Sequence, residues 1–105
     1  MKETVTTERK LIPVENIINA AQRLKGVAHH TPFMHSINLS DKYDANIFLK
    51  REDLQVVRSY KLRGAFNKIS SIEPSDLENG IVCASAGNHA QGVAYACNKL
   101  GIRGY

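Results

Sequence analysis

The sequence predicts an α/β fold in which a parallel sheet is flanked by helices. Stretches with the apolar spacing of strands and of helices alternate along the 105 residues. The run IVCASA at residues 81–86 is short, apolar and rich in small residues, as in a buried parallel strand. A helical pattern follows it directly. Because two or three strands cannot complete such a sheet, we expect the chain to be part of a larger fold.

The first helix is expected between Pro13 and Gly26. Proline suits the first turn of a helix, and glycine suits its C-terminal stop. The apolar residues between them recur at helical spacing and share one face: Val14, Ile17, Ile18, Ala21 and Leu24.

Three shorter elements are expected next. Residues 27–33 should be extended, because the residue before Pro32 is disfavoured in the α region. A short helix is expected in residues 37–45, with Ser36 as its candidate cap. The apolar centre of NIFLKRE, residues 46–52, favours a strand.

The second half of the chain repeats the alternation. Residues 53–60 should form a loop, and a helix should begin at Lys61, because helical apolar spacing returns after it. Residues 73–80 are rich in turn-forming residues. The strand at residues 81–86 then leads into a helix that ends at Gly101, and IRGY could begin another strand.

Composition and charge restrict the classes of function. Apolar residues make up 43% and charged residues 23% of the chain, as in soluble globular proteins. We expect a cytoplasmic protein without membrane contact, since no apolar run approaches the ~18 residues of a membrane span and no secretory signal is recognisable. The net charge of +4 leaves nucleic-acid binding as a weaker interpretation, because the basic residues are dispersed. The basic stretch at residues 50–68 indicates either a small anionic ligand or a solvated helix flank.

The cysteines and histidines form no recognisable metal or redox motif. Cys83 and Cys97 are not a C-x-x-C pair, and we expect two buried, reduced thiols. His29 and His30 are neighbours in an extended segment, so their side chains should point to opposite faces. The other histidines lack a convincing ligand set, and we expect no metal site.

Lys61 is a candidate catalytic residue. At the start of a helix, unpaired N–H groups create a partial positive charge, which disfavours a second positive charge. Arg63 nearby and partial burial beneath Tyr60 are expected to act in the same direction. The neutral amine that results is the form that Schiff-base chemistry requires. The alternative is an ordinary solvated lysine at a helix start, which the spacing alone leaves open.

The turn SAGNHAQG, residues 85–92, is a second candidate site. A small-residue turn between a strand and a helix directs backbone N–H groups toward one point, where an anion such as a carboxylate can bind. Ala86 and Gly87 allow close approach to the backbone. Asn88 can hydrogen-bond a phenolic oxygen. The alternative is a tight turn in which Asn88 is only the helix cap.

Two segments together resemble one enzyme family. LKREDLQVVRSYKLRGAFNKI, residues 49–69, and CASAGNHAQGVAYAC, residues 83–97, are similar to the N-terminal third of the threonine dehydratases, which are fold-type II pyridoxal-phosphate enzymes. The S-[FY]-K-x-R-G-A and S-A-G-N-H-A-Q-G motifs have the order and separation found in that family. The resemblance runs from about Pro13 to Tyr105, and REDLQ-x-VRS favours the biosynthetic dehydratases.

The resemblance implies roles for the matching residues. Lys61 corresponds to the lysine that bonds the cofactor pyridoxal 5'-phosphate and takes the substrate Cα proton. Tyr60 corresponds to the aromatic residue beside the cofactor ring, and Asn88 to the asparagine that hydrogen-bonds its 3-hydroxyl oxygen. The loop that receives the substrate carboxylate, largely through backbone N–H groups, corresponds to Ser85, Ala86, Gly87, Asn88 and His89.

The same resemblance implies the reaction and the domain plan. The reaction converts L-threonine to 2-oxobutanoate and ammonia, the first step of isoleucine biosynthesis, in a homo-oligomeric full-length enzyme. Residues 1–50 would begin the large cofactor domain, and residues 51–105 the cofactor- and substrate-binding α/β region of a tryptophan synthase β-like fold. The cofactor phosphate loop, the partner of the ring nitrogen and any regulatory domain are expected beyond residue 105.

Two alternatives to an active threonine dehydratase stay open. One is a serine dehydratase or racemase of the same family, since the residues that select the substrate are mostly outside the matching motifs. The other is a non-catalytic, truncated fragment, whose exposed apolar surface would favour association. In either case the 105-residue chain alone is expected to be inactive.

Overall fold

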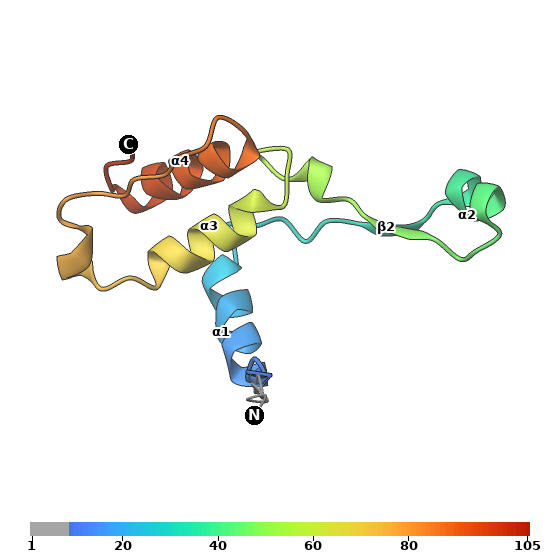
Figure 1. Ribbon diagram of the computed structural model, residues 1–105, viewed down its shortest axis with the longest axis horizontal. Helices are drawn as coiled ribbons and strands as arrows, with labels where there is room; N and C mark the ends of the chain where they lie inside the picture. The colour runs from blue at the N-terminus through green and yellow to red at the C-terminus, as the bar shows by residue number, and fades with distance from the viewer. Residues whose placement is uncertain (1–8) are drawn as a thin grey trace, which may run out of the picture.

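Helix α3, Lys61–Ser70, is the centre of the structure, a computed structural model that describes residues 9–105. Helix α4, Asn88–Leu100, packs along α3, and helix α1, Val14–Leu24, contacts α3 from another side (Figure 1). The radius of gyration is 18.2 Å. A compact chain of this length would have a value of about 13 Å, so the molecule is open and its elements have large solvent-exposed surfaces.

The hydrophobic core lies between α3 and α4. Because apolar residues in both helices recur at helical spacing, each helix has one apolar face, and the two faces meet. Leu62 is completely buried in this interface. The other buried core residues are Ala65, Phe66, Ile69, Val93, Ala96 and Cys97. The core therefore joins the two helices that carry the sequence-predicted sites.

Residues 81–105 form a unit of two extended segments joined by α4, and the predicted strands at residues 81–86 and 102–105 are reduced to an isolated bridge. Ile81 and Gly104 form a parallel bridge, and the amide of Tyr105 donates to the carbonyl of Ile81 at 2.8 Å. Helix α4 connects the two paired segments, as parallel pairing requires. The parallel arrangement agrees with the predicted α/β fold. The prediction that residues 81–86 are buried is wrong, because Val82 is 81% exposed. Within the described residues, this segment pairs along one edge with the segment that ends at Tyr105, so its other edge has no partner there.

A second sheet is antiparallel and stands apart from this unit. Strand β1, Phe33–His35, pairs with strand β2, Phe48–Lys50, with Met34 opposite Leu49. Figure 1 shows the two strands as an arm that ends in helix α2, Ile37–Tyr43. The predicted strand in residues 46–52 is confirmed but shorter, and its pairing is antiparallel, because its partner comes from the extended segment before α2.

Local signals predicted the helix ends correctly. Helix α1 begins after Pro13 and ends two residues before Gly26. Gly26 has φ 78°, in the left-handed region, which glycine adopts without steric cost. The Ser36 hydroxyl accepts a hydrogen bond from the Leu39 amide at 3.4 Å, as the capping prediction requires. Helix α4 ends at Gly101 with φ 68°.

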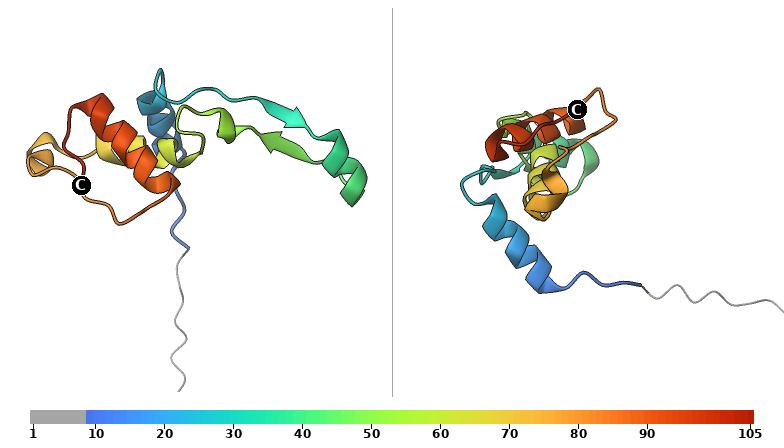
Figure 2. Two further views of the ribbon diagram at one scale, coloured as in Figure 1. Left: turned by 90° about the horizontal axis from the view of Figure 1, so that it is seen from above. Right: turned by 90° about the vertical axis from the view of Figure 1, so that its left-hand side faces the viewer.

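Helix α1 projects away from the core (Figure 2), and most of its apolar residues are exposed. Val14, Ile17 and Ile18 are 65%, 60% and 52% exposed. Two short 3-10 helices, Glu52–Leu54 and Pro74–Leu77, complete the described elements. Within residues 9–105, every helix is too short or too polar to cross a bilayer.

The two thiols differ in burial. Both cysteines are free; Cys97 is buried, as predicted, whereas Cys83 is only half-buried. Burial raises the pKa of the Cys97 thiol, and the neighbouring Cys83 adds to this effect. A thiol with a raised pKa is a poor nucleophile at neutral pH, so Cys97 is a packing residue.

Candidate functional site

Lys61 is the first residue of α3, as the sequence predicts. The preceding residue, Tyr60, makes no side-chain cap, and the Lys61 amide donates to the Ser59 hydroxyl at 3.4 Å. The Lys61 amine, Nζ, lies 5.2 Å from the centroid of the Tyr60 ring. The ring therefore flanks the amine, but Tyr60 is itself 60% exposed and Lys61 is half-buried.

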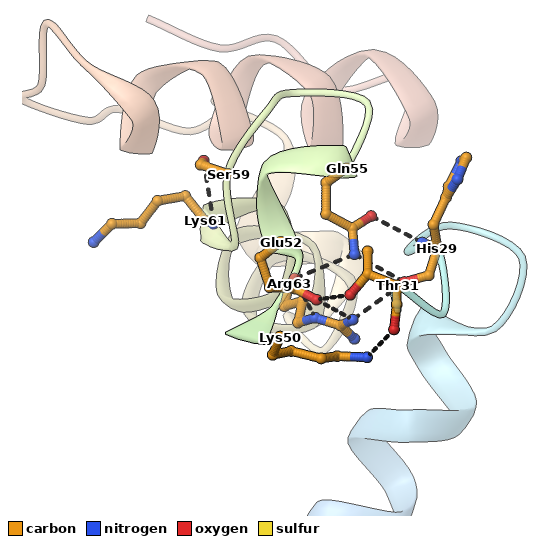
Figure 3. A network of polar contacts seen from close by, with 8 residues as sticks. All are labelled: His29, Thr31, Lys50, Glu52, Gln55, Ser59, Lys61 and Arg63. Atoms are coloured by element: carbon orange, nitrogen blue, oxygen red, sulfur yellow. Dashed lines mark hydrogen bonds and ion pairs between the residues drawn. The ribbon is translucent and has the colours of Figure 1, made fainter. Parts of the chain in front are cut away.

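Arg63 does not act on Lys61 as the sequence analysis expects. Its guanidinium forms a two-pronged ion pair with Glu52, with distances of 2.7 Å from Nε to Oε2 and 2.8 Å from Nη2 to Oε1. This carboxylate balances the positive charge of Arg63. Residues two apart on a helix lie about 200° apart around its axis, and Figure 3 shows the Lys61 side chain pointing away from this ion pair. The positive field at Lys61 is therefore that of the helix terminus.

The ion pair lowers the pKa of Glu52 to about 2. The hydrogen bonds from the Arg63 guanidinium are the main cause, and those from Thr31 and Gln55 add to them, against the opposing effect of burial. Glu52 is therefore charged at any physiological pH. The same interaction raises the pKa of Arg63.

The second candidate site is an exposed turn that opens α4. Gly87 is the residue before the helix, and its amide donates to the Ser85 hydroxyl at 3.3 Å. Asn88 is the first residue of α4, and no side-chain cap bond is present. The alternative interpretation of Asn88 as a cap is therefore wrong. The first amides of a helix have no acceptor within it, so this turn presents N–H donors to a ligand.

A close contact between the helices brings the two sites together. Gly92 faces the backbone of Lys61 and Leu62, and a Cβ built on Gly92 would lie 2.9 Å from the Lys61 carbonyl oxygen. Helices α3 and α4 run in the same direction, with their N-termini at the same end (Figure 1). Asn88 is one turn before Gly92 on α4. The amine of Lys61 and the turn at Asn88 therefore belong to the same end of the helix pair.

The turn residues do not all face one cavity. Ser85 lines a hollow of about 490 Å³ together with Cys83 and Tyr105. His89 lines a different hollow of about 190 Å³, with Gly64 among its neighbours. Ser85 and His89 thus border different hollows.

A buried polar network beside the start of α3 was not predicted from the sequence. Gln55 is completely buried, and Glu52 and Thr31 lie beside it. The signal that could have pointed to them is a glutamate and a glutamine three positions apart, Glu52 and Gln55, just before the loop that leads to Lys61. Gly92 was missed as well, although a glycine inside a helix costs about 1 kcal/mol and so often marks a close backbone contact.

Comparisons with known proteins agree on one family. The family model described as "Pyridoxal-phosphate dependent enzyme" matches residues 24–105. The biosynthetic L-threonine dehydratase IlvA of Bacillus subtilis is 57% identical over 97 residues, which cover 92% of this chain and 23% of that protein. The enzyme of the same name from Halalkalibacterium halodurans is 60% identical over 93 residues, 89% of this chain and 22% of that protein. The chain thus spans less than a quarter of these curated relatives.

Solved structures show the same similarity. The processed form of threonine deaminase isoform 2 from Solanum lycopersicum aligns with a TM-score of 0.75 and 39% identity, over 87% of this chain and 27% of that one. Maize serine racemase aligns with a TM-score of 0.79 and 33% identity, over 87% of this chain and 29% of that one. The α/β architecture therefore corresponds to part of a fold that several activities share.

Proposed function

Because the chain belongs to the family of pyridoxal-phosphate-dependent enzymes, we propose that Lys61 bonds the aldehyde carbon of pyridoxal 5'-phosphate and that the turn at Asn88 binds the substrate carboxylate. The contact between Gly92 and the Lys61 backbone is the observation that carries this proposal, because it joins the two motifs at one end of the helix pair. Each motif alone has an ordinary structural explanation.

The residues present fit this group. A Cβ built on Gly87 meets no atom within 4 Å, so a planar ligand can approach the backbone of the turn. Ser85 to His89 are all exposed, which leaves the first amides of α4 accessible to an anion. The Tyr60 ring lies against the Lys61 amine and could flank an aromatic ligand bonded there.

The chain's own residues then have separate tasks. Pyridoxal phosphate supplies an aldehyde and an electron-withdrawing ring. Lys61 moves the proton at the substrate Cα, since its amine is a base whenever it is neutral. The amides of the turn orient the carboxylate, and Asn88 hydrogen-bonds the phenolic oxygen of the cofactor. Both helix N-termini favour negative charge in this region.

For the complete protein we propose the deamination of L-threonine to 2-oxobutanoate and ammonia, the first step of isoleucine biosynthesis. Support comes from the two curated relatives that are called biosynthetic L-threonine dehydratases. In this proposal residues 1–50 begin the cofactor domain and residues 51–105 begin the α/β region with the site. A cytoplasmic homo-oligomer is proposed with it, and free thiols agree with a reducing compartment.

A serine dehydratase or racemase is the second candidate. The similarity to maize serine racemase favours it, because that protein shares the fold around both motifs. Turnover of L-threonine and of L-serine by the complete, full-length protein separates the two. A higher kcat/KM for threonine supports the first proposal, and racemised serine supports the second.

Covalent labelling tests the role of Lys61 directly. The complete, full-length protein is incubated with pyridoxal phosphate, reduced with borohydride and mapped by peptide mass spectrometry. We expect the label on Lys61 and its loss in Lys61→Ala. Lys68→Ala is the matched control, since Lys68 is an exposed lysine in the last turn of the same helix. A label that persists in Lys61→Ala with full turnover would contradict the proposal.

A further inference from the structure

We propose that Glu52 is a positioning residue, which holds the first turn of α3, and with it Lys61, in the geometry that cofactor binding needs. This inference rests on the proposed function. Glu52 belongs to the 3-10 helix before the site and lies outside the two turns that would contact a ligand. It acts through Arg63, two residues after Lys61.

Glu52 is the centre of a hydrogen-bond network in which both carboxylate oxygens have two partners (Figure 3). Oε1 accepts from Thr31 Oγ1 at 2.6 Å and from Arg63 Nη2 at 2.8 Å. Oε2 accepts from Arg63 Nε at 2.7 Å and from Gln55 Nε2 at 3.2 Å. The Glu52 side chain is only 15% exposed, so these bonds are poorly replaced by water.

The network ties three segments of the chain to one another. The buried amide of Gln55 accepts from the His29 backbone N–H at 2.9 Å and donates to the His29 carbonyl at 2.8 Å. Arg63 Nη2 donates to the same carbonyl at 3.2 Å. Lys50 Nζ donates to the Thr31 carbonyl at 2.6 Å. The segment 29–31, the segment 50–55 and α3 are therefore held in one arrangement.

The start of α3 depends on this support because its local capping is weak: the Lys61 amide donates to the Ser59 hydroxyl at a long 3.4 Å. Tyr60 provides no side-chain cap. In the preceding loop Arg58 has φ 62°, a left-handed conformation that is sterically unfavourable for an arginine. Gly92 holds the opposite side through its contact with the Lys61 carbonyl. Thus α4 contacts the first turn of α3 at the Lys61 carbonyl and Glu52 contacts it at Arg63, while the Lys61 side chain points away from the ion pair (Figure 3).

Glu52→Gln in the full chain tests the inference, with Asp53→Asn as the matched control. Both variants remove one carboxylate from adjacent residues, but Asp53 is exposed and pairs only with Arg51 at the surface. Pyridoxal phosphate affinity, from the absorbance change on titration, should weaken about tenfold in Glu52→Gln, which corresponds to the loss of about 1.4 kcal/mol. Borohydride labelling of Lys61 should slow in parallel, and Asp53→Asn should behave as the unmodified protein in both measurements.

Two further variants separate positioning from general stability. Ile69→Val removes a methyl group from the α3–α4 core, away from the network, and so lowers the free energy of unfolding. If it lowers stability as much as Glu52→Gln does, it should still leave pyridoxal phosphate affinity unchanged. Arg63→Met should weaken the affinity as Glu52→Gln does, and the double variant should be no worse than the poorer single one, because the pair acts as a unit. Additive effects of the two substitutions would overturn the proposal.

Hydrogen exchange decides the inference independently of the cofactor. Glu52→Gln should speed amide exchange in residues 59–65, whereas Asp53→Asn should not. Unchanged exchange there overturns the role of Glu52 even if Lys61 is labelled. Absence of the label in the unmodified protein overturns the proposed function, whatever the exchange shows.

Discussion

Gly92 lies directly against the backbone carbonyl of Lys61, so closely that no other residue type fits without a shift of one helix. An added Cβ would be 2.9 Å from the carbonyl oxygen and 3.0 Å from its carbon. Atoms of one helix backbone cannot give way as the end of a side chain can. The spacing between α3, which begins at Lys61, and α4, which begins at Asn88, is therefore determined by a missing side chain.

Gly92→Ala should destabilise the protein and weaken cofactor binding. Alanine favours a helix by about 1 kcal/mol over glycine, but the collision with the Lys61 backbone should outweigh this and give a net loss of about 1–3 kcal/mol. Urea unfolding of the full chain measures the change. Gly64→Ala is the control, because a Cβ at Gly64 meets no atom within 4 Å, and this variant should be neutral or slightly stabilising. Equal effects at the two glycines would contradict the interpretation.

The Glu52–Arg63 pair should make stability depend on pH in the acid range. The pKa of Glu52 falls from an ordinary value of 4.5 to about 2 on folding, so the unfolded chain binds more protons between these values. The stabilisation is complete above pH 4.5 and is lost as the pH falls toward 2.

Unfolding free energies of the full chain between about pH 7 and about pH 2 test this dependence. Glu52→Gln should flatten the acid decline by on the order of 3 kcal/mol. The pKa of Asp53 is lowered as well, by its bonds to Arg51, so Asp53→Asn shows how much of the decline an exposed pair contributes. A decline as steep in Glu52→Gln as in the unmodified protein would exclude a structural role for the carboxylate.

Leu62→Ala should be among the most damaging substitutions in the core. Leu62 has no exposed surface, and truncation of a buried leucine costs about 2–5 kcal/mol. Thermal unfolding followed by circular dichroism gives the loss. Val82→Ala removes apolar atoms from a residue that is 81% exposed, and should change stability by less than about 0.5 kcal/mol unless another part of the complete protein covers it.

Arg58→Gly should stabilise the loop before Lys61. Glycine adopts the observed φ of 62° without the steric cost that an arginine bears, a difference of about 1 kcal/mol. Arg58→Val should have the opposite sign, because a β-branched residue is strained there. Denaturant midpoints of the two variants, compared at equal slope, provide the test. A stabilising valine would show that the loop changes conformation.

Elements with strong local signals could be predicted from the sequence. The bounds of α1 and α4 follow from their apolar periodicity and from the glycines after them, and Ser36 caps α2 as its side chain predicts. The start of α3 at Lys61 is also local. Helices satisfy their backbone bonds within a few residues, so nearby sequence suffices to place them.

Pairing and burial could not be predicted in this way. Strand β2 pairs with β1, which precedes α2 in the sequence. The pairing is antiparallel because the chain reverses direction through α2, and this reversal has no local signal in either strand. The exposure of Val82 depends on which segments cover it, which its apolar character does not show. The effect expected of Arg63 was wrong for the same reason, since Glu52 lies eleven residues earlier in the chain.

By itself the sequence identified the candidate reactive groups, because a lysine amine and the backbone amides of a small-residue turn are set by residue type and local pattern. Tertiary structure decided which groups act together. The absent side chain of Gly92 sets the helix spacing, and the carboxylate of Glu52 pairs with Arg63, two residues after Lys61. These relations are contacts between distant segments, and distances of a few ångströms exist only after the backbone has folded.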